Sequence, residues 1–141
     1  MTFIICVSGQ LVFVIAPGVS VYLELAGVVF FAWLIASYTG AALVNPGITL
    51  GYYVELAKED DETSLNYCDY CQAYMQPQAK HCQECEVCIE EYDHHCPWTT
   101  KCIGKGNVKY FHSFLISFLV CFIYSIIVLG LHAHAANHRK G

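Results

Sequence analysis

Two long apolar stretches stand out in the sequence, and their length favours helices over strands. Residues 111–131 contain no acidic or basic residue apart from His112. At about 1.5 Å per residue, a helix of that length crosses a bilayer core of about 30 Å. Residues 19–44 are also long enough, and Glu24 is their only charge, near enough to the start to reach an interface. We predict a transmembrane helix at each stretch.

A shorter apolar run at residues 3–16 ends at Pro17 and Gly18, a pair that favours a tight turn. We therefore predict that residues 1–45 form a transmembrane helical hairpin. A secretory signal peptide is the alternative, but no basic residue precedes the run and no clear cleavage site follows it. Ala32, Ala36 and Gly40 recur at every fourth position of the second stretch, which predicts close helix packing on that face.

Polar residues fill the region between the second and the last apolar stretch. It contains the acidic run 59–62, which indicates a solvated linker over residues 46–67. A cysteine-rich segment follows at 68–109, then a third transmembrane helix at 110–132 and a tail at 133–141. No internal repeat is apparent, and we expect short hairpins and irregular turns in the cysteine-rich segment.

The composition places the chain in a membrane. Hydrophobic residues make up 56% of the 141 residues and charged residues only 13%, more apolar surface than a soluble domain of this size can bury. The net charge of -5 leaves no basic stripe that would neutralise a nucleic-acid backbone, so nucleic acid is excluded as a partner.

Seven of the nine cysteines fall within one short segment of the loop, interleaved with His81, His94 and His95. An odd number of cysteines mixed with histidines suits metal-bound thiolates in a reducing compartment better than disulfides. We therefore place the loop in the cytosol, and the positions of the flanking lysines favour this orientation slightly. The seven are Cys68, Cys71, Cys82, Cys85, Cys88, Cys96 and Cys102.

The spacing of these residues is typical of structural zinc. Two Cys-x-x-Cys pairs, with further cysteines and histidines, supply more ligands than one tetrahedral site needs. Because His81 and Cys82 are adjacent, they are poorly placed to share one site, so we expect two interleaved sites. Two sites of three cysteines and one histidine would leave one cysteine and one histidine over. A thiol beside a free imidazole can act as an activated nucleophile, but the count does not say which pair is spare.

Other interpretations of the cysteines are a single zinc with surplus cysteines, a zinc-ribbon or RING-like interaction module, and a redox pair. Redox chemistry of the thioredoxin kind is disfavoured, since it needs one Cys-x-x-Cys pair in an α/β setting. A purely structural module is the main competitor.

The residues around Cys96 resemble a known signature. Asp93, His94, His95 and Cys96 are followed by Pro97, Trp98, Cys102, Ile103, Gly104, Asn107 and Phe111. This resembles the DHHC-type zinc-containing protein S-acyltransferases, the palmitoyltransferases, and the upstream cysteines match the family over about 35 residues. Asn45, Pro46 and Gly47 look like the family's Asp-Pro-Gly motif with Asn in first place. The fold implied is an α-helical membrane protein with a helical hairpin, a third transmembrane helix and a small two-zinc domain in the cytosolic loop.

The resemblance also implies roles for single residues. Two structural zinc ions are expected, and His94 and Cys96 form the spare pair, with Asp93 orienting His94, His94 taking the thiol proton and Cys96 as the nucleophile. The lysines near Cys96 are candidate contacts to CoA phosphates. The two ligand sets are Cys68, Cys71, His81 and Cys88, then Cys82, Cys85, His95 and Cys102, and the lysines are Lys101, Lys105 and Lys109.

The implied function is transfer of a long-chain acyl group from acyl-CoA, through acyl-Cys96, to cysteines of membrane-associated proteins. We expect a multi-pass protein in the lipid of the Golgi or endoplasmic reticulum. The family usually has four or more spans and a Thr-Thr-x-Glu motif, so the chain resembles a member truncated after the third span, and a partner subunit is a candidate source of the missing one. Lys101 stands where the family usually has Asn. The alternative function is a zinc-braced scaffold subunit with weak or no activity.

Overall fold

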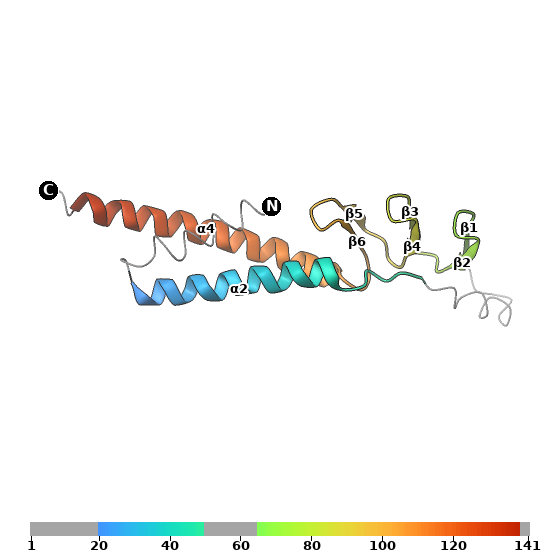
Figure 1. The fold of residues 1–141 in the computed structure, drawn as a ribbon, viewed down its shortest axis with the longest axis horizontal. Coiled ribbons are helices and arrows are strands. Elements are labelled where there is room, and N and C mark those ends of the chain that lie inside the picture. The colour runs from blue at the N-terminus through green and yellow to red at the C-terminus, as the bar shows by residue number, and fades with distance from the viewer. Residues whose placement is uncertain (1–19, 50–64, 139–141) are drawn as a thin grey trace. The chain divides into compact units, whose positions relative to one another are not determined.

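The computed structural model describes residues 20–49 and 65–138 (Figure 1). Two helices and three two-stranded antiparallel sheets make up this part of the chain. The apolar run at 3–16, the pair Pro17 and Gly18, and the acidic run 59–62 lie outside the described residues. The helical hairpin over residues 1–45 and the domain boundaries given above therefore stay predictions.

Helices form at both long apolar stretches. Helix α2 spans Val21–Leu43 and helix α4 spans Val108–His138. Both are long and apolar enough to cross a membrane. The chain divides into a helical unit, made of α2 up to Tyr38 and α4 from His112, and a hairpin unit from Thr39 to Phe111.

Serine hydroxyls and aromatic rings join the two helices within the helical unit. Ser37 Oγ lies 3.0 Å from Ser117 Oγ, and both residues are buried. Trp33 Nε1 donates to Ser113 Oγ at 2.9 Å. Each hydroxyl also lies within hydrogen-bond distance of a carbonyl of its own helix. Because each has one proton, one serine donates to the other and the second donates to its own helix, so neither hydroxyl is left unsatisfied in an apolar setting.

The predicted packing face of the second apolar stretch is wrong for two of its three residues. Ala32 and Ala36 are exposed, whereas Leu34 and Ser37 are buried. Gly40 does meet a close neighbour, since an added Cβ there would lie 2.5 Å from a ring carbon of Tyr110. The face of the helix that packs carries Leu34, Ser37 and Ala41 instead.

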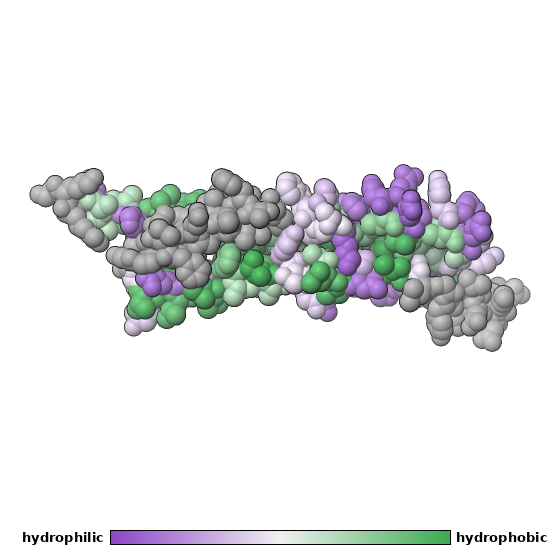
Figure 2. Space-filling view, in the orientation of Figure 1, coloured by the Kyte–Doolittle hydropathy of each residue, from purple (hydrophilic) through white to green (hydrophobic). Residues whose placement is uncertain are grey.

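The outward faces of both helices are apolar. Many large hydrophobic side chains of α2 and α4 are exposed, an arrangement that suits contact with lipid. Figure 2 shows apolar side chains along the helices and hydrophilic side chains over the hairpins. Examples of the exposed residues are Val28, Val29, Leu119, Phe122, Ile126 and Ile127.

The three hairpins of the hairpin unit share one design (Figure 1). Each consists of two three-residue strands joined by a four-residue turn. The last turn residue of each has a positive φ, at Gln72, Glu86 and Thr100, a conformation that is uncommon for residues other than glycine. The strands are β1 (Asn66–Cys68), β2 (Ala73–Met75), β3 (Lys80–Cys82), β4 (Val87–Ile89), β5 (His94–Cys96) and β6 (Lys101–Ile103).

These hairpins repeat every fourteen residues, which corrects the expectation that the loop has no internal repeat. The cross-strand partners are Tyr67 and Tyr74 in the first hairpin, His81 and Cys88 in the second, and His95 and Cys102 in the third. Cys68, Cys82 and Cys96 each end the first strand of their hairpin. Cysteine and histidine recur at this spacing in the sequence, but most of the other equivalent positions carry different residue types.

The segment after α2 docks on the hairpins. Asn45 Oδ1 accepts hydrogen bonds from the N–H groups of Gly47 and Ile48 at 2.9 and 3.0 Å. The turn needs only a side-chain oxygen that accepts these hydrogen bonds, so Asn45 can form it as well as the Asp of the family motif would. Gly47 has φ +102°, which favours glycine, and its carbonyl accepts from Glu90 N–H at 2.8 Å.

Asn107 joins three parts of the hairpin unit. It is fully buried, and its Nδ2 donates to the carbonyls of Ala41 in α2 and Cys102 in β6, at 3.0 and 2.9 Å. Its Oδ1 accepts from Gly104 N–H at 3.0 Å. The end of α2, strand β6 and the start of α4 are thereby held together beside the third hairpin.

Gly106→Ala is expected to destabilise the hairpin unit by about 1–3 kcal/mol. An added Cβ would overlap the carbonyl oxygen of Asn45, a backbone atom that cannot move aside cheaply. Gly130→Ala is the control, since nothing lies within 4 Å of the added atom. Thermal unfolding of the two variants in detergent measures the difference, and equal melting temperatures would contradict the close approach.

Candidate functional site

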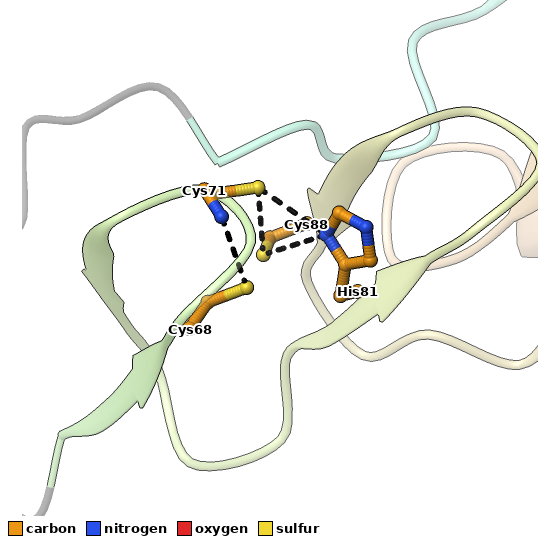
Figure 3. A group of neighbouring side chains, drawn as sticks. All are labelled: Cys68, Cys71, His81 and Cys88. Carbon is orange, nitrogen blue, oxygen red and sulfur yellow. Dashed lines mark hydrogen bonds between the residues drawn. The ribbon is translucent and has the colours of Figure 1, made fainter.

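Four side chains from the first two hairpins converge on one point (Figure 3). Cys71 Sγ lies 3.3 Å from His81 Nδ1 and 3.5 Å from Cys88 Sγ, and Cys88 Sγ lies 3.8 Å from the same nitrogen. Cys68 completes the set, with its sulfur 3.4 Å from the N–H of Cys71. We call this set cluster 1.

Cluster 2 repeats the arrangement one hairpin further along. Cys85 Sγ lies 3.4 Å from His95 Nδ1 and 3.3 Å from Cys102 Sγ. His95 Nδ1 also lies 3.6 Å from Cys82 Sγ and 3.8 Å from Cys102 Sγ. In both clusters two cysteines come from the turn region of one hairpin, and the histidine and third cysteine are cross-strand partners in the next.

The distances in both clusters fit a tetrahedral metal ion. Zinc binds thiolate sulfur at about 2.3 Å and imidazole nitrogen at about 2.1 Å, so neighbouring ligand atoms of a tetrahedron lie about 3.6–3.8 Å apart. The distances within the clusters run from 3.3 to 3.8 Å. Three thiols and one imidazole are a donor set that suits zinc, so each cluster is able to hold such an ion.

The electrostatics of the thiols also favour a cation. Burial and the neighbouring thiols raise the pKa of Cys88 to about 12, and the same causes raise the pKa of Cys102. For Cys68, burial opposes ionisation but hydrogen bonds from the backbone of Cys71 and other neighbours outweigh it and lower the pKa. Thiolates that lie this close repel one another, and a divalent cation between them offsets the electrostatic cost of ionising them.

Strand alternation explains how the sets separate. His81 and Cys82 are adjacent in β3, so their side chains point to opposite faces, and they lie in clusters 1 and 2 respectively. The same alternation in β5 directs His95 to cluster 2 and places His94 and Cys96 on the other face. Among the described residues, Cys96 is a free cysteine that belongs to neither cluster.

The surroundings of His94 would hold its ring in place. His94 Nδ1 lies 3.6 Å from Asp93 Oδ2, an ion-pair distance that is too long for a good hydrogen bond. Phe111, in the first turn of α4, meets the imidazole edge to face at a centroid distance of 5.0 Å. Both His94 and Asp93 are partly exposed, whereas Cys96 is 2% exposed.

The three lysines predicted to contact CoA phosphates have different surroundings. Lys101 Nζ donates to the carbonyl of Leu43 at 3.2 Å, at the C-terminal end of α2, where a positive charge is favourable. Lys105 Nζ lies 3.3 Å from Glu90 and 3.6 Å from Glu91, and these carboxylates raise its pKa. Lys109 Nζ lies 5.1 Å from the ring centre of Tyr110. Their contact with CoA stays a prediction.

Some residues at the site were not singled out by sequence reasoning. Tyr70 stacks on the ring of His81 with centroids 4.9 Å apart, and so covers one side of cluster 1. Thr99 is buried in the turn after Cys96, with Oγ1 3.4 Å from the Cys96 carbonyl oxygen. The fourteen-residue spacing from Cys71 to Cys85 to Thr99 is the sequence signal that could have identified Thr99.

Comparison with known proteins agrees with this geometry. The family model for the DHHC palmitoyltransferase matches residues 61–140. Palmitoyltransferase ZDHHC8 of Homo sapiens is 30% identical over 141 residues, covering 90% of this chain and 18% of the relative. Palmitoyltransferase ZDHHC5 of Homo sapiens is 33% identical over 133 residues, covering 82% and 18%.

The match extends over a larger share of a fungal relative. Palmitoyltransferase ERF2 of Candida glabrata is 32% identical over 128 residues, covering 77% of this chain and 39% of the relative. The chain thus spans less than half the length of each of these relatives. The family model nevertheless covers more than half of the chain, including both clusters and Cys96. The chain belongs to the DHHC palmitoyltransferase family.

Proposed function

We propose that this chain is a protein S-acyltransferase that carries a long-chain acyl group on Cys96. One observation carries the proposal: the two clusters take up six cysteines and two histidines, and the strand that contributes His95 to cluster 2 places Cys96 outside both. A thiol left free beside His94 is suited to nucleophilic catalysis. The palmitoyltransferase relatives support the same reaction.

The first half of the reaction loads the enzyme. His94 takes the proton from Cys96 Sγ, and the thiolate attacks the thioester carbonyl of acyl-CoA. The carbon–sulfur bond to CoA breaks, and the CoA thiolate leaves with the proton that His94 returns. Asp93 holds the imidazole and stabilises its protonated form. Cys96 is buried, so the acyl-CoA reaches it only after neighbouring side chains move.

The second half transfers the acyl group to a cysteine of a membrane-associated protein. The substrate thiol gives its proton to His94 and attacks the acyl-Cys96 carbonyl, and Cys96 leaves as a thiol. Each half exchanges one thioester for another, so neither needs a nucleotide or a redox cofactor. When zinc is bound in clusters 1 and 2, it would brace the hairpins that position these residues.

The membrane setting supplies binding energy for the acyl chain. Cys96 precedes the start of α4 by twelve residues, so the thiol is placed near the boundary of the predicted span. Burial of an acyl chain in the membrane contributes about 0.8 kcal/mol per CH₂. We place the cysteine-rich loop on the cytosolic face of the Golgi or endoplasmic reticulum, where acyl-CoA is in reach.

Incubation with labelled palmitoyl-CoA tests the function. The purified chain in detergent is expected to acquire a label that neutral hydroxylamine removes, because hydroxylamine cleaves thioesters. An oxygen ester or an amide would survive the treatment. A chain that holds two zinc ions and never acquires a hydroxylamine-sensitive label would contradict the proposal.

His94→Ala is expected to slow labelling by about 10²–10⁴-fold, the range that general-base catalysis contributes. The two clusters do not include His94, so zinc content should stay at two per chain. His112→Ala is the control, since His112 is an exposed histidine of α4 that has no role in the proposal. Comparable labelling rates for the two variants would remove His94 from the mechanism.

A further inference from the structure

The third hairpin has the backbone of the first two but a different pair of residues in its turn. The pair lies at the end of the first strand and in the turn of each hairpin: Cys68 and Cys71 in the first, Cys82 and Cys85 in the second, and Cys96 and Thr99 in the third. All three turns contain four residues and end in a positive φ, 50°, 55° and 52°. The conformation that brings two thiols together in clusters 1 and 2 is therefore kept where only one thiol remains.

The array also stops at this hairpin. Each cluster pairs the turn cysteines of one hairpin with the histidine and cysteine of the next. After the third turn the chain enters α4, and the positions fourteen residues beyond His95 and Cys102 carry Lys109 and Ile116, which are not usual zinc ligands. The third hairpin thus offers one thiol, and among the described residues no further hairpin follows it to complete a site.

We infer that the β5–β6 hairpin has the framework of the metal-binding hairpins but lacks their second thiol, and that Thr99, in the place of that thiol, keeps Cys96 free. The inference rests on the proposed metal role of clusters 1 and 2. A lone thiol holds a soft ion or electrophile weakly. Two thiols held by one turn bind it as a chelate, because the second contact forms at a high effective concentration.

The packing around Thr99 allows the inference to be tested by substitution. Thr99 is 4% exposed, and its hydroxyl lies 3.4 Å from the Cys96 carbonyl oxygen, a weak hydrogen bond whose loss costs little. Cysteine has nearly the volume of threonine, so Thr99→Cys places a second thiol in the turn without overpacking. The turns of the first two hairpins already accept cysteine at this position.

Thr100→Cys is the matched control. It adds a thiol one residue further along, at the positive-φ position where the other two turns carry Gln72 and Glu86. Neither of these belongs to a cluster. A thiol at 100 is therefore expected not to meet the sulfur of Cys96.

Phenylarsine oxide, which bridges two nearby thiols, is the probe. Two As–S bonds form, the arsenic-bound oxygen leaves as water with the two thiol protons, and the arsenic is neither oxidised nor reduced. With two zinc ions bound per chain, Thr99→Cys is expected to take up one arsenical, seen by native mass spectrometry. Alkylation of Cys96 by N-ethylmaleimide should then slow at least tenfold. Wild type and Thr100→Cys should take up none.

Further variants locate the bridge and keep every outcome decisive. The double variant Cys96→Ser with Thr99→Cys is expected to lose the adduct. An adduct that persists there, or a Thr99→Cys chain that takes up no arsenical, would overturn the inference. Loss of zinc from Thr99→Cys while Thr100→Cys keeps both ions would also overturn it, because a true third turn accepts a thiol at position 99.

The acyl label separates this inference from the proposed function. A wild-type chain that is never acylated, together with an arsenical bridge in Thr99→Cys, would sink the acyltransferase proposal and leave the third-turn inference standing. An acylated wild-type chain, together with a Thr99→Cys chain that forms no bridge, would support the acyltransferase proposal and overturn the third-turn inference. If both hold, phenylarsine oxide should lower acylation of Thr99→Cys at least tenfold and leave wild type unchanged.

Discussion

Cys96→Ala is expected to reduce the hydroxylamine-sensitive acyl label on the order of 10³-fold or more, to background. The proposed reaction has no path without this thiol, and removal of a covalent nucleophile has effects of this size in other enzymes. Because Cys96 lies in neither cluster, zinc content should remain at two per chain. The measurement is the rate of label incorporation from palmitoyl-CoA, with metal content determined on the same sample.

Cys121→Ala is the matched control for that variant. Cys121 is also buried and free, and it belongs to neither cluster. Its sulfur lies 3.4 Å from the Phe30 carbonyl oxygen within the helical unit. Label that persists on the Cys96→Ala chain would show that another group carries the acyl chain. An equal loss of label in the two variants would show that the effect is not specific to Cys96.

Cys102→Ala is expected to release about one zinc per chain and to abolish labelling as well. The variant removes one of four ligands of cluster 2, which joins the β3–β4 hairpin to the β5–β6 hairpin that carries Cys96. Metal binding at a structural site is folding free energy, so loss of a ligand unfolds what the ion holds. Metal analysis and thermal unfolding in detergent measure the effect.

Cys88→Ala supplies a comparison within the same array. It also removes one ligand, but cluster 1 joins the first two hairpins and not the one that contains Cys96. We expect loss of one zinc and a smaller loss of labelling than in Cys102→Ala. A Cys102→Ala chain that keeps two zinc ions and full stability would contradict the ligand assignment in cluster 2.

The sequence by itself supplied ten candidate ligands and indicated two sites, but it did not choose which cysteine and histidine are spare. Adjacent His81 and Cys82 had to serve different sites, because neighbours in a strand face opposite sides. Which histidine and cysteine remained over depended on register. His95 is the cross-strand partner of Cys102, and this pairing leaves His94 and Cys96 on the other face. The resemblance to the family supplied that choice.

The hairpin repeat and the helix contact became clear only from the structure. The period of fourteen residues is present in the sequence, at Cys68, Cys82 and Cys96, but it was missed because the third repeat carries Thr99 where Cys71 and Cys85 stand in the first two. The helix contact was predicted on the wrong face because a repeat of small residues does not show which face of a helix meets its neighbour. In the structure Ser37 and Ser117 meet through a hydrogen bond. Long-range hydrogen bonds such as these leave no local pattern.

Native mass spectrometry of the wild-type chain after incubation with palmitoyl-CoA tests the central claim most directly. The claim is that eight side chains hold two metal ions while one remaining sulfur reacts. We predict a single species that carries two zinc ions and one acyl group, with fragmentation placing that group on Cys96. Acylation elsewhere in the chain, or acylation of Cys96 only after a zinc ion is lost, would contradict the account.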